Sequence, residues 1–125
     1  MEPGVIADDR LAELADMFHL MGDPTRLSVL LACLDQARAV SDLAAATGAS
    51  ASLVSHHLRL LRAARIVRAE RRGRQIFYCA ADAHIRDMLA QMVEHVGERP
   101  RSEKAAPETA VVARRARGRA ARGLA

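Results

Sequence analysis

The side chains of this sequence best suited to chemistry form two pairs with nitrogen and oxygen donors. The first pair is Asp82 and His84, and the second is His95 and Glu98. Imidazole nitrogen and carboxylate oxygen both bind Zn²⁺ in proteins. The sequence therefore contains a candidate set of four metal ligands, divided into two halves.

The spacing of the two pairs prevents one chain from closing a metal site. His84 and His95 are 11 positions apart, which is roughly 16 Å along a helix and only about 20° around it. Because a zinc–nitrogen bond is about 2 Å long, one copy cannot bring both pairs to one ion. An antiparallel second copy would place the first pair beside the second pair of its neighbour. The alternative is a charged surface helix with two solvated histidines.

The residues between the two pairs have the spacing of an amphipathic helix. Asp82 is expected to cap this helix. Apolar side chains recur along one face, at Ile85, Met88, Leu89, Met92, Val93 and Val96. This apolar stripe predicts a dimer contact, and His84 and His95 lie at its rim.

Four helices are expected before this last one. Their starts are marked by Asp8 or Asp9, by Asp23-Pro24, by the region of Ser41, and by Ser50, which are residues that favour helix N-termini. Gly48 separates the third helix from the fourth, so residues 40–64 form a helix, a tight turn and a second helix. This arrangement is the helix-turn-helix pattern.

Two short runs of strand-forming residues follow, from Val67 to Tyr78, around Arg72-Gly73-Arg74. A glycine between two such runs predicts a β-hairpin, and a hairpin directly after a helix-turn-helix forms a wing. We therefore expect a mainly α domain with a small β-hairpin over residues 8–98. This is a winged helix-turn-helix, homodimeric through its N- and C-terminal helices.

Positive charge is concentrated on the fourth helix and the wing. From Arg59 to Arg74 there are seven arginines and one acid, Glu70, whereas residues 1–98 have 11 basic and 13 acidic side chains, a net charge of −2. A basic region on an otherwise acidic domain predicts a face that binds the phosphates of nucleic acid. The competing interpretation is a solvated basic surface.

The first half of the fourth helix is the part of a helix-turn-helix that meets base edges. Adjacent helical residues point about 100° apart, so we favour His56 facing double-stranded DNA and His57 packed inside. The full set of candidate DNA contacts is Ser52, Ser55, His56, His57, Arg59, Arg62, Arg72 and Arg74. The last two, at the wing tip, are expected to reach phosphates or the minor groove.

The segment 99–125 differs in composition from the rest of the chain. It has eight basic and two acidic residues and two prolines, and we expect a disordered basic tail that serves as a solubilising extension or as an arm attracted to phosphates. No apolar run is long enough for a membrane span, and the N-terminus lacks the pattern of a signal peptide. A cytoplasmic location without membrane contact is therefore expected.

Four segments carry a resemblance to a known family, namely Phe18–Leu27, Ser41–Ala44, Ser52–Leu61 and Arg72–Tyr78. In this order they resemble the ArsR/SmtB family of metal-responsive transcriptional repressors, over about residues 10–98. Asp82, His84, His95 and Glu98 match the family's fifth-helix sensor signature position by position. The resemblance implies a homodimer that binds zinc, or cobalt or nickel, between subunits and then releases a palindromic operator. The third-helix cysteine motif of some relatives is absent.

Ligand chemistry independently favours zinc, because two imidazoles and two carboxylates complete a four-coordinate set. Octahedral cobalt or nickel would need further ligands or water.

Two other functions are weighed against metal sensing. A repressor that responds to oxidants or sulfur species could use Cys33 and Cys79, although neither thiol has an evident exposed, electropositive setting. A zinc hydrolase would need an open coordination position. The four ligands leave none, and no general base or nucleophile is visible, so no enzyme activity is expected.

Overall fold

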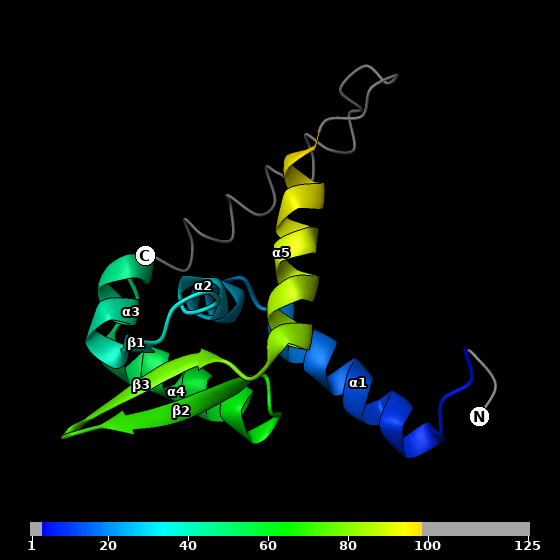
Figure 1. The fold of residues 1–125 in the computed structure, drawn as a ribbon, viewed down its shortest axis with the longest axis horizontal. Coiled ribbons are helices and arrows are strands. Elements are labelled where there is room, and N and C mark those ends of the chain that lie inside the picture. The colour runs from blue at the N-terminus through cyan, green and yellow to red at the C-terminus, as the bar shows by residue number, and fades with distance from the viewer. Residues whose placement is uncertain (1–3, 99–125) are drawn as a thin grey trace. The chain divides into compact units, whose positions relative to one another are not determined.

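The computed structural model describes residues 4–98, and Figure 1 shows the arrangement of the chain. Its elements are α1 (Asp8–Met21), α2 (Pro24–Ala32), β1 (Arg38–Ala39), α3 (Val40–Thr47), α4 (Ala51–Ala63), β2 (Val67–Arg72), β3 (Gln75–Ala80) and α5 (Ala83–Gly97). The chain divides into two units, one ending at Arg86 and the other beginning at Asp87, so α5 starts in the first and continues into the second. The expected basic tail, residues 99–125, lies outside the described residues.

Local capping bonds begin the helices on either side of the helix-turn-helix core. The carboxylate of Asp23 accepts a bond from the backbone N–H of Arg26 at 2.9 Å, with Pro24 at the first position of α2. The hydroxyl of Ser50 accepts from the N–H of Leu53 at 3.1 Å and begins α4. Both caps satisfy backbone donors that a helix leaves without partners, and both confirm the prediction.

One helix start differs from the prediction. The residue that caps α1 is Ala7, which supplies no side-chain bond, and Asp8 and Asp9 lie in the first turn instead. There they favour the helix through its dipole rather than as caps. Helix α3 begins at Val40, which agrees with the start predicted in the region of Ser41, and the chain enters it directly from β1.

The sheet is antiparallel and has three strands in the order β1-β3-β2 within the described residues. Strands β2 and β3 form the predicted wing, with Arg72 opposite Gln75 across a turn whose Gly73 has a φ of 64°. A positive φ at the first residue of a two-residue turn suits glycine and matches the twist of a hairpin. The strand β1 was not predicted, since two residues are too few to show an alternating pattern. It pairs Arg38 with Tyr78 of β3.

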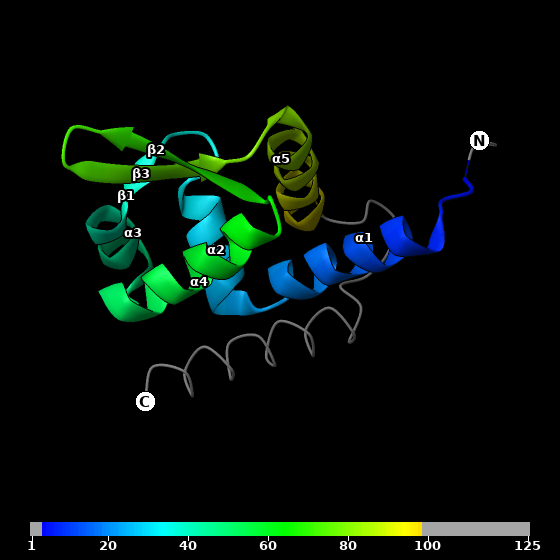
Figure 2. The same cartoon turned by 90° about the horizontal axis from the view of Figure 1, so that it is seen from below.

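The core of the first unit lies between the helices and the sheet, whose ribbons are drawn in Figure 2. Its most buried side chains are Leu30, Leu43, Leu58, Leu61, Ile66, Val29, Val54 and Cys33. They come from α2, α3, α4 and the segment leading into β2, so the apolar face of α4 is fixed against two other helices. The opposite face of α4 is thereby presented to solvent.

A left-handed turn at the end of α4 directs the chain into the wing. Arg65 has a φ of 60°, and the N–H of Ile66 donates to the carbonyl of Leu61 at 2.9 Å. This is a common way to end a helix. The Arg65 guanidinium also forms an ion pair with Glu13, which links α4 to α1.

Candidate functional site

The exposed face of α4 carries most of the candidate DNA contacts. Ser52, His56, Arg59 and Arg62 are exposed and Ser55 is half-buried, whereas Val54, Leu58 and Leu61 face the core. On a helical wheel the exposed set falls within an arc of about 120°. Hydroxyl and imidazole groups occupy the start of this stripe, and the two guanidiniums occupy its end.

His57 belongs to the core rather than to this stripe, although it was among the candidate contacts. Only 6% of its surface is exposed, and its Nδ1 accepts a bond from Nε of Arg26 at 3.3 Å. Burial lowers the pKa of His57 below its usual 6.5, and the nearby Arg26 charge lowers it further. His57 is therefore held as a neutral acceptor, which leaves His56 as the exposed imidazole.

Arg26 connects three helices through its side-chain contacts, and sequence reasoning missed it. Its Nη1 donates to the backbone carbonyl of Leu20 near the end of α1 at 3.1 Å, while Nε reaches His57 on α4. Its own backbone N–H donates to the carboxylate of Asp23, which caps α2. The two side-chain contacts fix the position of α4 relative to α1 and α2.

Stability is expected to fall with acid through His57. Because its pKa is lowered in the folded state, the unfolded chain takes up a proton first as the pH drops below 6.5. The stabilisation is complete above pH 6.5 and is lost below it, by about 1.4 kcal/mol for each unit of pKa shift. The groups nearest the imidazole are Arg26, Asp23 and His56.

Urea unfolding between about pH 7.5 and pH 5 would measure this loss. The control is His57→Gln, whose amide oxygen can still accept from Arg26 but does not titrate. The free energy by which the wild type is more stable than the variant should shrink as the pH falls. A difference that stays constant over this range would contradict the assignment.

The structure separates the arginines of the basic cluster into two groups. Arg65, Arg68 and Arg72 form ion pairs with carboxylates, and Nε of Arg71 donates to the Gly73 carbonyl at 3.3 Å. Within residues 4–98, the remaining three make no side-chain hydrogen bond or ion pair. These are Arg59, Arg62 and Arg74. They are the guanidiniums with all their donors open to a phosphate.

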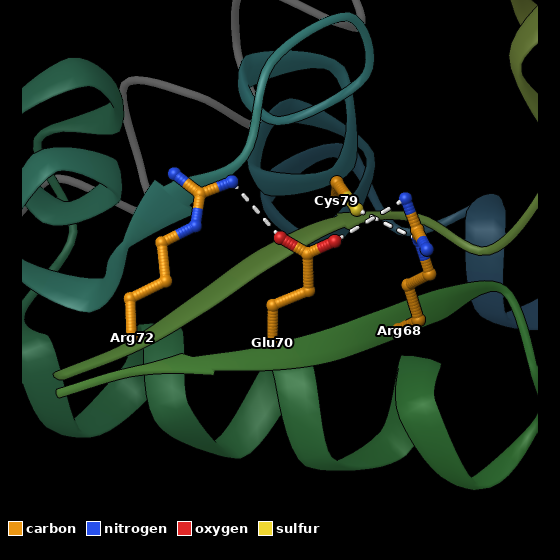
Figure 3. Close-up of polar contacts among 4 residues, drawn as sticks. All are labelled: Arg68, Glu70, Arg72 and Cys79. Carbon is orange, nitrogen blue, oxygen red and sulfur yellow. Dashed lines mark hydrogen bonds and ion pairs between the residues drawn. The ribbon is translucent and has the colours of Figure 1, made fainter.

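The outer face of the wing is organised by Glu70, as Figure 3 shows. Its carboxylate lies between Arg72, at 2.9 Å, and Arg68, at 3.5 Å. The Arg72 guanidinium also lies 4.9 Å from the centre of the Phe77 ring. Arg72, a candidate DNA contact, therefore already pairs with the Glu70 carboxylate and lies over the Phe77 ring.

The two thiols lie inside the first unit. Cys33 is fully buried, and its pKa is raised to about 12, mainly by burial and then by Cys79. Cys79 is 8% exposed, and its sulfur accepts a bond from Nε of Arg68 at 3.1 Å (Figure 3). Because the reactive species is the thiolate, the protonated Cys33 is a poor nucleophile. The setting of Cys33 therefore gives no support to a thiol sensor.

The first half of the candidate metal set lies at the start of α5. Asp82 Oδ1 accepts from the N–H of Ile85 at 3.1 Å, which confirms that this residue caps the helix. The same oxygen lies 3.6 Å from Nδ1 of His84, whose side chain is 96% exposed. The helix bond to Ile85 lowers the pKa of Asp82, and the neighbouring His84 lowers it less. A carboxylate and an imidazole are thus adjacent and accessible.

The second half lies at the other end of the same helix. His95 and Glu98 are both exposed, and the N–H of Glu98 bonds to the carbonyl of His95 at 3.1 Å. The continuous helix from Ala83 to Gly97 keeps this pair away from Asp82 and His84. No group of three or more potential ligands occurs among the described residues. One chain therefore keeps the two pairs of candidate ligands apart.

Two apolar surfaces have no cover within the described chain, one on each unit. In α1 the exposed side chains are Leu11, Leu14 and Phe18, and in α5 they are Met92, Val93 and Val96. The predicted stripe of α5 is thus divided, since Ile85 and Leu89 are buried. No helix in the part that the structure describes is long and apolar enough to cross a membrane.

Comparisons with known proteins agree with these features. A model of the bacterial regulatory protein arsR family matches residues 23–69. The transcriptional repressor SmtB homolog of Synechocystis sp. is 38% identical over 98 residues, which is 78% of this chain and 74% of that protein. The HTH-type transcriptional regulator KmtR of Mycobacterium tuberculosis is 37% identical over 108 residues, 83% of each chain. These relatives are regulators and not enzymes.

A solved structure shares the fold. It is the homodimeric winged helix-turn-helix DNA-binding domain of a possible ArsR-family transcriptional regulator from Mycobacterium bovis. It superposes with a TM-score of 0.63 and 26% identity, over 75% of this chain and 91% of that one. The expected fold class is confirmed by this likeness and by the order of the elements.

Proposed function

The chain belongs to the ArsR family of bacterial regulatory proteins, and we propose that it is a metal-controlled transcriptional repressor. One observation carries the proposal. A stripe of unpaired arginines and a divided set of four metal ligands occur on the same chain. The first feature suits operator DNA, and the second suits a regulatory ion shared by two copies.

DNA binding is assigned to α4 and the wing. Ser52, Ser55 and His56 lie at the start of α4, where a recognition helix meets base edges in the major groove. Arg59 and Arg62 follow on the same stripe, and Arg74 lies at the wing tip, so their charges suit phosphates. Arg72 remains in the set, although Glu70 and Phe77 already hold it.

A second copy of the chain is the proposed cover for the exposed apolar side chains of α1 and α5. Exposed aromatic and aliphatic residues at helical spacing are typical of homodimer contacts. A two-fold dimer would also present two copies of α4, which suits a palindromic operator with one half-site for each copy. The homodimeric relative from Mycobacterium bovis supports this arrangement.

The metal ligands are Asp82 and His84 of one copy with His95 and Glu98 of the other. The structure fits this assignment because Asp82 and His84 are adjacent, and Oδ2 of Asp82 has no part in the helix cap. Two imidazoles and two carboxylates favour zinc, with cobalt or nickel as alternatives. A zinc ion bound there supplies a cross-link of fixed length between the two copies of α5.

Release of DNA follows from that constraint. Ligands from both copies of α5 can meet at one ion only in certain dimer geometries, so zinc selects those geometries. If they separate the two α4 helices by a distance unsuited to successive major grooves, operator affinity falls. By linkage, DNA must weaken zinc binding by the same factor. The sign, with zinc releasing DNA, is the one that the family resemblance implies.

Fluorescence anisotropy with and without zinc tests the proposal. The probe is an operator duplex selected by the zinc-free protein from a random-sequence library. Zinc at saturation is expected to weaken binding by about 5- to 150-fold, the usual range of allosteric coupling.

The control for this measurement is His84→Ala, which should bind the duplex like the wild type and respond little to zinc. Equal wild-type affinities with and without saturating zinc would refute metal control. A zinc-free protein that selects no duplex would refute the DNA-binding function itself.

A further inference from the structure

A hollow of about 480 Å³ lies between α4 and β3. It is lined by Ser55, Leu58, Arg59, Arg62, Ala63 and Tyr78. The five α4 residues follow the spacing of a single helix face, and Tyr78 closes the hollow from the central strand of the sheet. The hollow is therefore a fixed feature of the packing between the recognition helix and the wing.

The polar groups of this hollow suit an anion. Arg59 and Arg62 are the only charged residues among its lining, and neither guanidinium has a hydrogen bond or an ion pair within residues 4–98. Ser55 and Tyr78 add two hydroxyl groups that can donate. Guanidinium and hydroxyl donors converging on one space are the usual partners of phosphate oxygens.

The apolar part of the lining indicates what accompanies the anion. The exposed Ala63 gives the hollow a hydrocarbon wall, and Leu58 lies almost fully buried behind it. A free inorganic anion gains nothing from such a wall, whereas the carbon atoms of a deoxyribose do. The combination of polar donors and an apolar wall suits a phosphate together with its sugar.

The position of the hollow along α4 indicates which part of a nucleic acid would bind in it. Ser52 precedes the hollow on the exposed stripe, His56 lies next to its first lining residue, Ser55, and Arg62 lies roughly 15 Å beyond Ser52 along the helix axis. If the start of α4 meets base edges, its later turns reach the edge of the groove, where the backbone lies.

We propose that this hollow is a backbone clamp for one strand of bound DNA, with Tyr78 as a direct phosphate contact. Arg59 and Arg62 neutralise the phosphate, the Tyr78 hydroxyl donates to one of its oxygens, and the exposed Ala63 contacts the sugar. The inference rests on the proposed DNA-binding function and adds a residue, Tyr78, that the candidate set did not contain.

The clamp is tested by measuring how the full-length protein binds a DNA duplex over a series of KCl concentrations. The duplex has a mixed sequence of about 30 base pairs, because phosphate contacts do not depend on sequence. Arg62→Gln should lower affinity and reduce the slope of log affinity against log salt by about 0.9, the value for one lost phosphate contact. Tyr78→Phe should lower affinity about threefold to tenfold and leave the slope unchanged, since the phenol is uncharged.

The matched control is Arg65→Gln, which removes the same charge three residues later on a side chain that pairs with Glu13 outside the hollow. It should change the salt slope clearly less than Arg62→Gln does. Thermal unfolding would verify that Tyr78→Phe, which keeps the ring, is folded like the wild type.

Three outcomes would overturn the clamp. The first is wild-type affinity in folded Tyr78→Phe, and the second is an equal loss of slope in Arg62→Gln and Arg65→Gln. The third is that the hollow is a site for free phosphate. In that case inorganic phosphate would displace the duplex from the wild type much better than chloride does at equal ionic strength, and it would have no such advantage with Arg62→Gln. In all three the wild type still binds DNA, whereas absence of wild-type binding would reject the proposed function together with the clamp.

Discussion

Combining His84→Ala chains with His95→Ala chains in one dimer is expected to restore a zinc site that neither variant has alone. In a dimer of either variant, both shared sites lack one of their four ligands. In the mixed dimer one site lacks two ligands, whereas the other has Asp82 and His84 from one chain and His95 and Glu98 from the other. One complete site therefore returns for each mixed dimer.

The expected effect is large, because zinc affinity depends on the whole ligand set. Loss of groups that merely support a ligand already costs about 10- to 100-fold in affinity, and loss of a ligand should cost at least as much. Wild-type dimers are expected to bind two zinc ions tightly, dimers of each variant none, and mixed dimers one. Two different affinity tags would isolate the mixed dimer, and a chelator competition titration would measure its zinc.

The matched control mixes two defects in the same half of the site. Combining His84→Ala with Asp82→Asn leaves every shared site with a defect, so tight binding should not return. Asparagine is chosen because its amide oxygen can still accept from Ile85 and cap α5. Restoration in this control, or its absence in the His84 and His95 mixture, would show that the ion is not held between two copies.

Replacing Arg26 by alanine is expected to destabilise the fold substantially, although the residue lies outside the proposed contact set. The change removes the donors to Nδ1 of His57 and to the carbonyl of Leu20. Leaving a buried acceptor without its partner costs about 1–3 kcal/mol. For a domain of this size, that corresponds to a fall in Tm of roughly 5–20 °C, which thermal unfolding followed by circular dichroism would show.

A double-mutant cycle would separate this contact from general loss of packing. Arg26→Leu alone and His57→Leu alone should each destabilise, and the double variant should be more stable than the sum of the two losses predicts. Arg59→Ala is the control, since an exposed, unpaired arginine should change stability by no more than about 0.5 kcal/mol. Simple additivity in the cycle would mean that the Arg26–His57 contact contributes nothing of its own.

The sequence was most informative where the responsible contacts are local. Asp23, Ser50 and Asp82 each cap a helix by bonding to an N–H three residues later. Gly48, with a φ of 74°, ends α3. Such contacts depend on residue type and on a few neighbouring positions, so the order of helices could be read directly. The separation in space between Asp82 and Glu98 likewise followed from the geometry of a continuous helix.

Local signals were insufficient at two places in the chain. Asp8 and Asp9 are good caps by type, yet the helix starts at them rather than after them. The strand β1 exists because Arg38 and Ala39 pair with β3, nearly 40 residues later. No property of two isolated residues indicates such pairing, since it depends on the position of the partner strand.

By itself, then, the sequence determined the winged helix-turn-helix, the excess of arginine on α4 and the wing, and the division of four candidate metal ligands between the ends of one helix. Only the tertiary structure decided which side chains are free to act. It placed His57 in the core against Arg26, tied Arg72 to Glu70, and left Arg59 and Arg62 beside Tyr78. The physical reason is distance along the chain: Arg26 and His57 are 31 positions apart, and such residues meet only after the helices between them have packed.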